Sequence, residues 1–215
     1  MKKLLLIVGV VASTLTFGQS NESGTIHVRV GVGFDISGGS AEITMDGPPA
    51  ATFSGDAAAV GVMYSLKAEY GLADAFSAGI FVKRAGLATV FTYGGFSSDA
   101  EILGGFGFGV GGSWYAVNKD KFNFYLAPSV GYTTLSMDYK ISDGNGNIKT
   151  TTTNYSGLIY GINTGVNVYF GDVAGMFFDL GYAGRMISST EDEVTTDLSL
   201  GGVEFSLGLS LKFGN

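Results

Sequence analysis

The sequence predicts an all-β protein, an eight-stranded antiparallel up-and-down transmembrane β-barrel that is preceded by a cleaved signal peptide. Three observations predict this fold class. Apolar residues alternate with small or polar residues over eight separate segments, which is the period of a strand with one apolar face. After the first residues, no apolar run approaches the roughly 20 residues that a membrane-spanning helix needs. The connections between the segments are alternately short and long, as in an up-and-down barrel.

The composition of the 215 residues excludes several classes of protein. The chain has no cysteine, which excludes a disulfide framework, a thiolate metal site and a lipid-anchored N-terminal cysteine. Charged residues make up only 14%, and there are 35 glycines but 3 prolines, so the chain is neither acidic and disordered nor collagen-like. The mean hydropathy of +0.29 is high for a soluble protein. This hydrophobicity is spread along the chain by alternation.

Residues 1–19 have the pattern of a secretory signal peptide. Lys2 and Lys3 give a basic start, residues 4–12 form an unbroken apolar run, and small residues follow near the expected cleavage site. Removing the two lysines leaves 10 basic residues against 19 acidic residues, a net charge of −9. The remaining residues, 20–215, are predicted to form a single β-barrel domain. We expect this domain to be exported and acidic.

The first four predicted strands each place apolar side chains on one face and small, polar or charged side chains on the other. The polar face of the first strand carries His27, Arg29 and Asp35, for example. Alternation at period 2 indicates a strand whose two faces meet different surroundings. The apolar faces are Ile26, Val28, Val30, Val32, Phe34 and Ile36 in 25–37; Val60, Val62, Tyr64, Leu66, Ala68 and Tyr70 in 60–70; Phe76, Ala78, Ile80 and Val82 in 76–83; and Phe106, Phe108, Val110 and Trp114 in 105–114.

The last four predicted strands follow the same rule, with glycine, serine and asparagine common on the polar face. Eight is an even number, as an up-and-down barrel with both termini at one end requires. The apolar faces are Phe122, Phe124, Leu126, Pro128, Val130 and Tyr132 in 122–132; Leu158, Tyr160, Ile162, Val166, Val168 and Phe170 in 158–170; Met176, Phe178, Leu180 and Tyr182 in 176–185; and Val203, Phe205, Leu207, Leu209, Leu211 and Phe213 in 203–213.

The lengths of the connections between these strands predict which end of the barrel faces the periplasm and which faces the cell exterior. Short turns and long loops alternate strictly, which is typical of transmembrane barrels with periplasmic turns and extracellular loops. The short turns are predicted at 71–75, 117–121 and 171–175, and the long loops near 38–56, 91–100, 140–153 and 188–197.

Alternation alone does not decide which face of the barrel points outward. A soluble barrel would turn the apolar face inward, whereas a membrane barrel turns it to lipid and fills the interior with polar groups. Almost all strand charges share the polar face, and Arg84 is the exception on the apolar face. The charges on the polar face are Arg29, Asp35, Lys67, Glu69, Lys83, Glu101, Asp179, Arg185, Glu204 and Lys212.

Aromatic residues favour the membrane orientation. Eight of them lie on the apolar face beside a short turn, and aromatic rings banded at one level suit the headgroup region of a membrane. A soluble core gives no reason for such a band. The residues are Tyr70, Phe76, Trp114, Phe122, Phe124, Phe170, Phe178 and Phe213.

The polar face holds five basic and five acidic residues, a balance that burial in a narrow lumen requires. The inner positions of the strands at 105–114, 122–132 and 158–170 are mostly small, so we expect a thin wall that leaves room for long ionic side chains crossing the lumen. The excess of acidic residues falls mainly in the long loops, which are therefore predicted to be acidic.

The C-terminal strand, together with the signal peptide, the eight amphipathic strands and the alternating turns, resembles the small outer-membrane β-barrels of the OmpA/OmpX type, often labelled porin-family proteins. Residues 206–213 fit the polar-x-Gly-x-x-apolar-x-apolar pattern of that family, and Gly214 and Asn215 follow its aromatic residue. The resemblance implies an integral protein of the bacterial outer membrane, part of the cell envelope, that is inserted by the β-barrel assembly machinery.

No catalytic, cofactor-binding or metal-binding residue is predicted. His27 is the only histidine, and closure of the first strand on the last could bring it near Ser210 and Glu204, an arrangement known in lipid-modifying barrel enzymes. We instead predict that His27 is a polar side chain that fills the lumen.

Three further features have a plain interpretation. Residues 143–147 superficially resemble a calcium loop but lack its turn glycine and its final glutamate, so a hairpin tip is favoured. Residues 191–193 form an acidic cluster that could hold divalent cations against lipopolysaccharide phosphates, although a charge run is usually a solvated loop. Arg84 either faces lipid and anionic headgroups or marks a bulge.

We therefore expect an integral outer-membrane barrel of structural or surface-interaction type, with a plugged polar lumen, acidic extracellular loops and no enzymatic activity. A lipid-modifying barrel enzyme and a narrow channel for small solutes are the alternatives. The expected partners are outer-membrane lipid and lipopolysaccharide, the assembly machinery, and an unknown partner of the extracellular loops. No cofactor is expected, an acidic chain is a poor binder of nucleic acid, and a monomer is expected.

Overall fold

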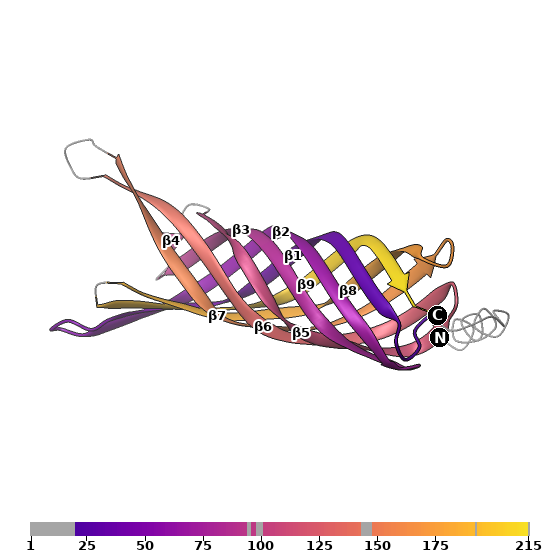
Figure 1. Cartoon of the computed structure of the whole chain (residues 1–215). Helices are drawn as coiled ribbons and strands as arrows, with labels where there is room; N and C mark the ends of the chain where they lie inside the picture. The colour runs from indigo at the N-terminus through magenta and orange to yellow at the C-terminus, as the bar shows by residue number, and fades with distance from the viewer. Residues whose placement is uncertain (1–19, 94–95, 98–100, 143–147, 192, 215) are drawn as a thin grey trace, which may run out of the picture.

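The computed structural model describes residues 20–93, 96–97, 101–142, 148–191 and 193–214, so the predicted signal peptide lies outside the described residues. Within these described ranges the chain forms eight long strands and one short strand (Figure 1). They are β1 (Ile26–Met45), β2 (Ala51–Ala73), β3 (Phe76–Tyr93), β4 (Phe96–Ser97), β5 (Glu101–Lys119), β6 (Phe122–Ser142), β7 (Ile148–Tyr169), β8 (Ala174–Glu191) and β9 (Val194–Phe213).

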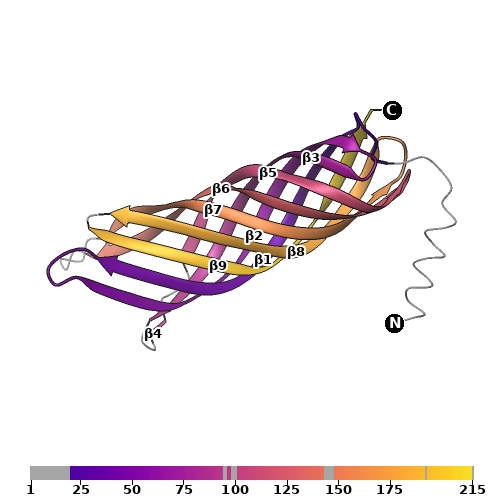
Figure 2. The ribbon, with the colours of Figure 1, turned by 90° about the horizontal axis from the view of Figure 1, so that it is seen from below.

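The eight long strands form one closed antiparallel ring, which confirms the predicted up-and-down barrel (Figure 2). Each long strand pairs with the next one in the chain, and β9 returns to pair with β1 along its whole length, from Ile26↔Phe213 to Met45↔Val194. The short strand β4 pairs only with the last residues of β3. The start of β1 and the end of β9 lie at the same end of the barrel, since Ile26 pairs with Phe213; we call this the proximal end, and the opposite end is the distal end (Figure 1).

The strands are staggered around the ring. A row of paired residues that starts at Thr134 on β6 passes through β5, β3, β2, β1, β9, β8 and β7 and returns to β6 at Phe124, ten residues away. A stagger of this kind tilts the strands by about 35–45° from the barrel axis. The tilt is visible in Figure 2. Among the residues that the structure describes, no helix is long and apolar enough to cross a membrane.

The apolar faces of the predicted strands point outward. Phe34 is 53% exposed and Ile36 is 67% exposed, whereas their neighbour Asp35 is fully buried. On β1 the outward apolar row runs from Ile26 to Ile36, eleven residues, which is the length that a tilted strand needs to cross a bilayer. The predicted aromatic band also faces outward, and Trp114 is 47% exposed. Such an outward belt requires lipid around it.

The predicted long loops are wrong in extent, because the strands continue through most of them. β1 continues to Met45 and β2 begins at Ala51, so only 46–50 remain of the predicted loop at 38–56. The loop expected at 188–197 is likewise strand apart from the tip between β8 and β9. At the other two loops, β3 and β6 extend to Tyr93 and Ser142, and β5 and β7 begin at Glu101 and Ile148.

The reason for this error is that the alternation reverses at the distal end. Near the proximal end of β9, the outward residues are apolar, as at Leu207, and the inward residues are polar, as at Ser206. Beyond Gly201 the inward residues are Leu200 and Leu198, each 2% exposed, while Ser199 points outward. The distal part of the barrel lies outside the membrane, so its outer surface meets water and its interior needs an apolar core. The apolar side chains of one strand therefore point outward in the membrane and inward beyond it.

Candidate functional site in the barrel lumen

The proximal mouth of the lumen holds a network of amide and hydroxyl groups. Ser20 and Asn21, the first described residues, are 1% and 0% exposed. The Ser20 hydroxyl donates to Asn118 Oδ1 at 3.0 Å, and the Asn21 side-chain amide donates to the backbone oxygens of Ala73 at 2.7 Å and Asp74 at 3.1 Å. The segment that precedes β1 is therefore packed into the barrel mouth and tied to the β2–β3 turn.

His27 belongs to this polar network, as predicted. Its Nδ1 lies 3.1 Å from the Tyr169 hydroxyl, and its Nε2 lies 3.1 Å from Asn21 Oδ1. Ser210 reaches His27 only through Tyr169, whose hydroxyl lies 3.2 Å from Ser210 Oγ. Glu204 instead binds Lys83. The arrangement of His27, Ser210 and Glu204 considered for a lipid-modifying enzyme is therefore absent from these described residues, since the histidine binds neither of the other two.

The middle of the lumen is an ionic cluster centred on Glu69 of β2. Arg29 Nη2 lies 2.5 Å from Glu69 Oε2, and Lys67 Nζ lies 2.7 Å from Glu69 Oε1. The Ser113 hydroxyl on β5 donates to the same carboxylate at 2.9 Å, and the Ser77 hydroxyl donates to it at 3.2 Å. Both carboxylate oxygens are thus satisfied, as a buried anion requires.

Arg29 crosses the lumen from β1 to the opposite wall, as the small inner residues there predict. Its guanidinium lies 4.4 Å from the ring centroid of Tyr125 on β6, and it donates to Ser113 Oγ at 3.1 Å. The Tyr125 hydroxyl donates to Asp179. Gly165 of β7 makes room for this pair, because a Cβ atom there would lie 2.6 Å from Tyr125 Cζ.

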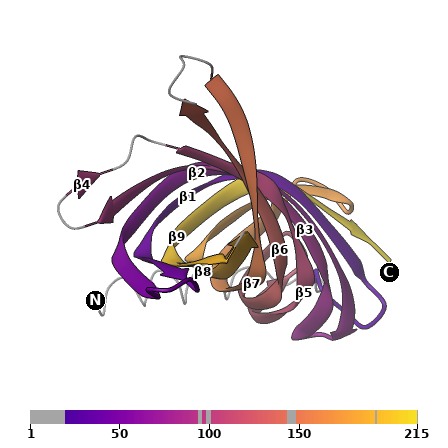
Figure 3. The same ribbon diagram turned by 90° about the vertical axis from the view of Figure 1, so that its left-hand side faces the viewer.

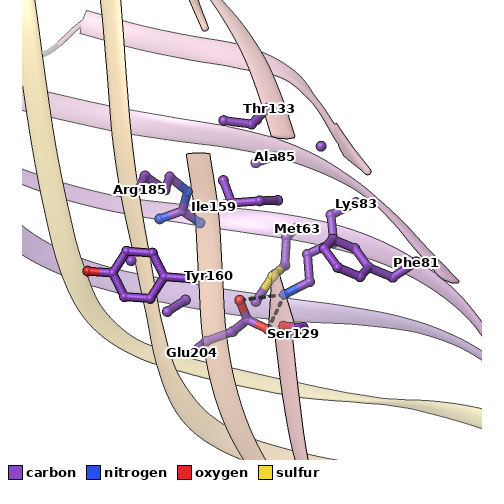
Figure 4. Close-up of a pocket in the computed structure, with 13 residues that line it drawn as sticks. Met63, Phe81, Lys83, Ala85, Ser129, Thr133, Ile159, Tyr160, Arg185 and Glu204 are labelled. Carbon is purple, nitrogen blue, oxygen red and sulfur yellow. Dashed lines mark hydrogen bonds and ion pairs between the residues drawn. The ribbon is translucent and has the colours of Figure 1, made fainter. Parts of the chain in front are cut away.

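Two more ion pairs lie nearer the distal end. Lys83 Nζ lies 2.7 Å from Glu204 Oε1 and 2.8 Å from Oε2 (Figure 4). Arg185 Nη2 lies 2.9 Å from Asp35 Oδ2. Small cavities of about 30 and 40 Å³ flank the Lys83–Glu204 pair. Each has room for about two or three water molecules.

The structure thus brings together charges that the sequence only assigned to one face. Nine of the ten predicted inner charges have described side chains; the side chain of Glu101 is not described. Lys212 pairs with Asp120 of the β5–β6 turn, at 3.1 Å between Nζ and Oδ1. Sequence reasoning missed Asp120, because it assigned residues 117–121 to a turn and did not consider that a turn can fold over the barrel mouth.

The distal lumen is filled by an apolar cluster that the sequence analysis also missed. Its members come from all eight long strands and are 0–8% exposed. The signal was present as the reversed alternation, mostly in residues between the predicted apolar rows and the predicted long loops. The cluster consists of Ala41, Ala57, Ala59, Leu87, Phe91, Leu103, Leu135, Met137, Tyr155, Ile187, Leu198 and Leu200.

The structure describes two of the three remaining sequence features, Arg84 and part of the acidic cluster at 191–193, but not the segment 143–147. Arg84 points outward, and the pairing of β3 with β2 and β5 is regular around it, so the bulge interpretation is wrong. Residues 143–147 lie outside the described residues. In the acidic cluster at 191–193, Glu191 Oε2 accepts a hydrogen bond from Thr153 at 3.2 Å. No group of three or more His, Cys, Asp or Glu side chains within the described ranges could hold a metal ion.

Comparison with known proteins identifies the fold. No family model and no curated protein matches the chain. Among solved structures, the outer membrane protein OprG from Pseudomonas aeruginosa has a TM-score of 0.66 at 12% identity, covering 92% of this chain and all of OprG. The chain folds as a small outer-membrane β-barrel. Neisserial surface protein A has a TM-score of 0.50 at 15% identity, over 89% of this chain and all of that protein. At such identities the likeness concerns the fold of the outer-membrane barrel alone.

Proposed function

We propose that this outer-membrane β-barrel is a structural or surface-interaction protein with a closed lumen and no enzymatic activity. In this proposal the proximal end faces the periplasm and the distal end faces the cell exterior. Outer-membrane lipid and lipopolysaccharide surround it, the β-barrel assembly machinery inserts it as a monomer, and an external partner binds the distal hairpins. Half of the ten acidic residues predicted for the long-loop end would then lie on strands that rise above the membrane, namely Glu42, Asp56, Asp138, Glu191 and Asp197.

The observation that carries the proposal is the way the lumen is filled. Polar groups occupy the proximal mouth, ion pairs occupy the middle, and the apolar cluster occupies the distal part. An eight-stranded barrel encloses space for little more than its own side chains. A solute would have to displace buried ion pairs and then cross an apolar core, and both steps are costly.

The narrow-channel alternative has one observation in its favour, the two cavities beside Lys83 and Glu204. They leave room for water in the polar part of the lumen, but the apolar cluster lies between them and the distal end. A channel would need that cluster to open.

Conductance in planar bilayers tests the proposal. We expect no reproducible steps of porin size from the purified, refolded protein. The control is the double variant Leu135→Ala and Leu200→Ala, which removes apolar volume from the distal lumen and should raise leak conductance above that of the wild-type barrel. Stable large steps from the wild-type protein would contradict a closed lumen and would favour the channel.

A further inference from the structure

The outer surface of the barrel has a hollow where two glycines face each other. Gly86 of β3 pairs with Gly104 of β5, and both belong to the outward row of their strands. A Cβ atom at either position would have no neighbour within 4 Å. The same row continues to Val62 on β2 and Ser136 on β6. The outward side chains are thus missing at two adjacent positions in the middle of a four-strand surface.

The side chains around the two glycines form a groove of about 1000 Å³. One part of its wall is apolar and includes Val62, Ile102 and Phe106. Another part belongs to β6 and is polar, with Thr134, Ser136 and Asp138. Figure 3 shows the distal ends of β6 and β7 leaning away from the ring at this side of the barrel. The groove therefore joins an apolar surface to a hydroxyl- and carboxylate-bearing one.

Arg84 forms the remaining part of the wall. Of the basic side chains that the structure describes, it alone lies on the outward face between the two ends of the barrel. Its guanidinium lies 5.3 Å from the ring centroid of Phe106, and no described acidic side chain lies within ion-pair distance of it. Its donors are thus held beside the groove without a partner anion.

The level of Arg84 in the membrane follows from the strand geometry. It lies eight residues beyond Phe76 of the aromatic band. With a rise of about 3.3 Å per residue and a tilt of about 40°, this is roughly 20 Å above the band. The apolar belt of such barrels is about 25 Å tall, so the side chain can extend to the outer headgroup level.

Gly86 lies two residues distal to Arg84 on β3, so the hollow lies above Arg84, on the side of the cell exterior. We propose that this groove binds a phosphorylated glycolipid of the outer leaflet, with a sugar over Gly86 and Gly104, a phosphate on Arg84 and the acyl chains on the apolar surface below Arg84. The inference rests on the proposed role of lipopolysaccharide as a partner and assigns it a site. Three observations select this class of lipid. The missing side chains leave space for a sugar ring, the unpaired guanidinium complements a phosphate, and the polar groups of β6 complement sugar hydroxyls.

The polar wall favours a sugar over a phospholipid headgroup. Asp138 accepts a hydrogen bond from Thr152 at 2.6 Å, and Ser136 donates to Asn154 Oδ1 at 2.7 Å. These side chains are exposed and retain further acceptor capacity for hydroxyl groups. The carboxylate of Asp138 would repel a second phosphate placed beside it, so the phosphate belongs at the Arg84 side.

The experiment uses the purified full barrel in detergent micelles and measures lipid binding by native mass spectrometry. The probes are a bisphosphorylated, acylated glucosamine disaccharide, its dephosphorylated form, and phosphatidylcholine. The site variants are Arg84→Gln and Gly104→Leu. Their matched controls are Lys121→Gln, which removes a cation at the proximal turn, and Gly38→Leu, which adds a side chain at another open outward glycine, where the nearest atom to a Cβ would be 3.8 Å away.

We expect Arg84→Gln to weaken binding of the phosphorylated probe at least about ten-fold and to leave binding of the dephosphorylated probe unchanged. Gly104→Leu should weaken both, and the two control variants should bind like the wild type. If Arg84→Gln and Gly104→Leu bind the glycolipid as tightly as the wild type does, the proposed site is wrong, although the barrel still binds the lipid. Wild-type binding of the glycolipid no tighter than that of phosphatidylcholine would overturn the lipid partnership itself. Loss of folding in a variant would show as loss of the heat-dependent gel shift, and Gly86→Leu would then replace Gly104→Leu.

Discussion

Arg29 and Glu69 form an ion pair in the middle of the lumen, 2.5 Å between Nη2 and Oε2, with side chains that are 3% and 0% exposed. The pair joins β1 to β2, and Lys67 and Ser113 bind the same carboxylate. A single acid thus pairs with a buried arginine and a partly buried lysine and, with Ser77, links four strands. The stability of the middle of the barrel should therefore depend on this one side chain.

The first prediction concerns removal of that charge. Glu69→Gln leaves the buried Arg29 and the partly buried Lys67 without their anion, so we expect a loss of about 3–5 kcal/mol in the free energy of unfolding. Urea unfolding in lipid vesicles measures it. The control is Glu42→Gln, an exposed carboxylate on the distal part of β1, for which we expect about 0–1 kcal/mol. Equal and small changes for the two variants would mean that the polar face is not buried.

The second prediction tests the reversed alternation at the distal end. Leu200→Ala removes a side chain that is 2% exposed from the apolar cluster, and we expect a loss of about 2–5 kcal/mol. Its neighbour Ser199 points to the outer surface, and Ser199→Ala should change stability by less than about 0.5 kcal/mol. Urea unfolding distinguishes them, and a larger effect at Ser199 would show that the distal strands are not arranged as a water-exposed barrel.

The third prediction concerns the segment before β1. Asn21→Ala removes hydrogen bonds to the β2–β3 turn and to His27 Nε2, so buried polar groups lose their partner. We expect a loss of about 1–3 kcal/mol. Ser23→Ala, at an exposed position two residues away, serves as the control and should be nearly silent. Indistinguishable unfolding curves would mean that the segment does not stabilise the mouth in the membrane.

The fourth prediction concerns assembly. Phe213 faces outward at the end of β9, is 46% exposed, and pairs with Ile26 where the ring closes. Truncation before Phe213 should lower membrane insertion without reducing export, because the predicted signal peptide is unchanged. Membrane fractionation together with the heat-dependent gel shift of a folded barrel measures insertion. The control truncation removes Asn215 alone, and normal insertion of the longer truncation would show that the C-terminal pattern is incidental.

The sequence was sufficient for the fold because the lipid-facing rows have a simple period. Ile26 to Ile36 alternate without a break, and the same is true of Val203 to Phe213, so the strands and their outward face could be predicted. The distal extensions could not be recognised in that way. At Leu198 and Leu200 the apolar residues occupy the inward positions of β9, whereas from Val203 onward they occupy the outward positions. An alternation that is followed with apolar residues on one face only therefore ends before Leu200.

The sequence predicted which side chains point into the lumen but not which of them bind one another. The positions of Lys83 and Glu204 on the inner face follow from parity, but the pair links residues 121 apart, and its formation depends on the stagger of the ring. The same holds for Arg185 and Asp35. The ion pair of Asp120 could not be predicted for a different reason. Asp120 lies in a turn, and alternation along the sequence does not show whether a turn folds over the barrel mouth.

The continuation of the strands beyond the membrane has a consequence for recognition. A flexible loop must be ordered when a partner binds it, and that loss of conformational entropy weakens association. Here Ser40, Glu42, Ser188 and Asp197 belong to neighbouring paired strands, which fix their spacing before any partner arrives. A partner with a complementary surface would meet a rigid template, so its association should show a small entropic penalty and a rate governed by encounter rather than by folding of the target.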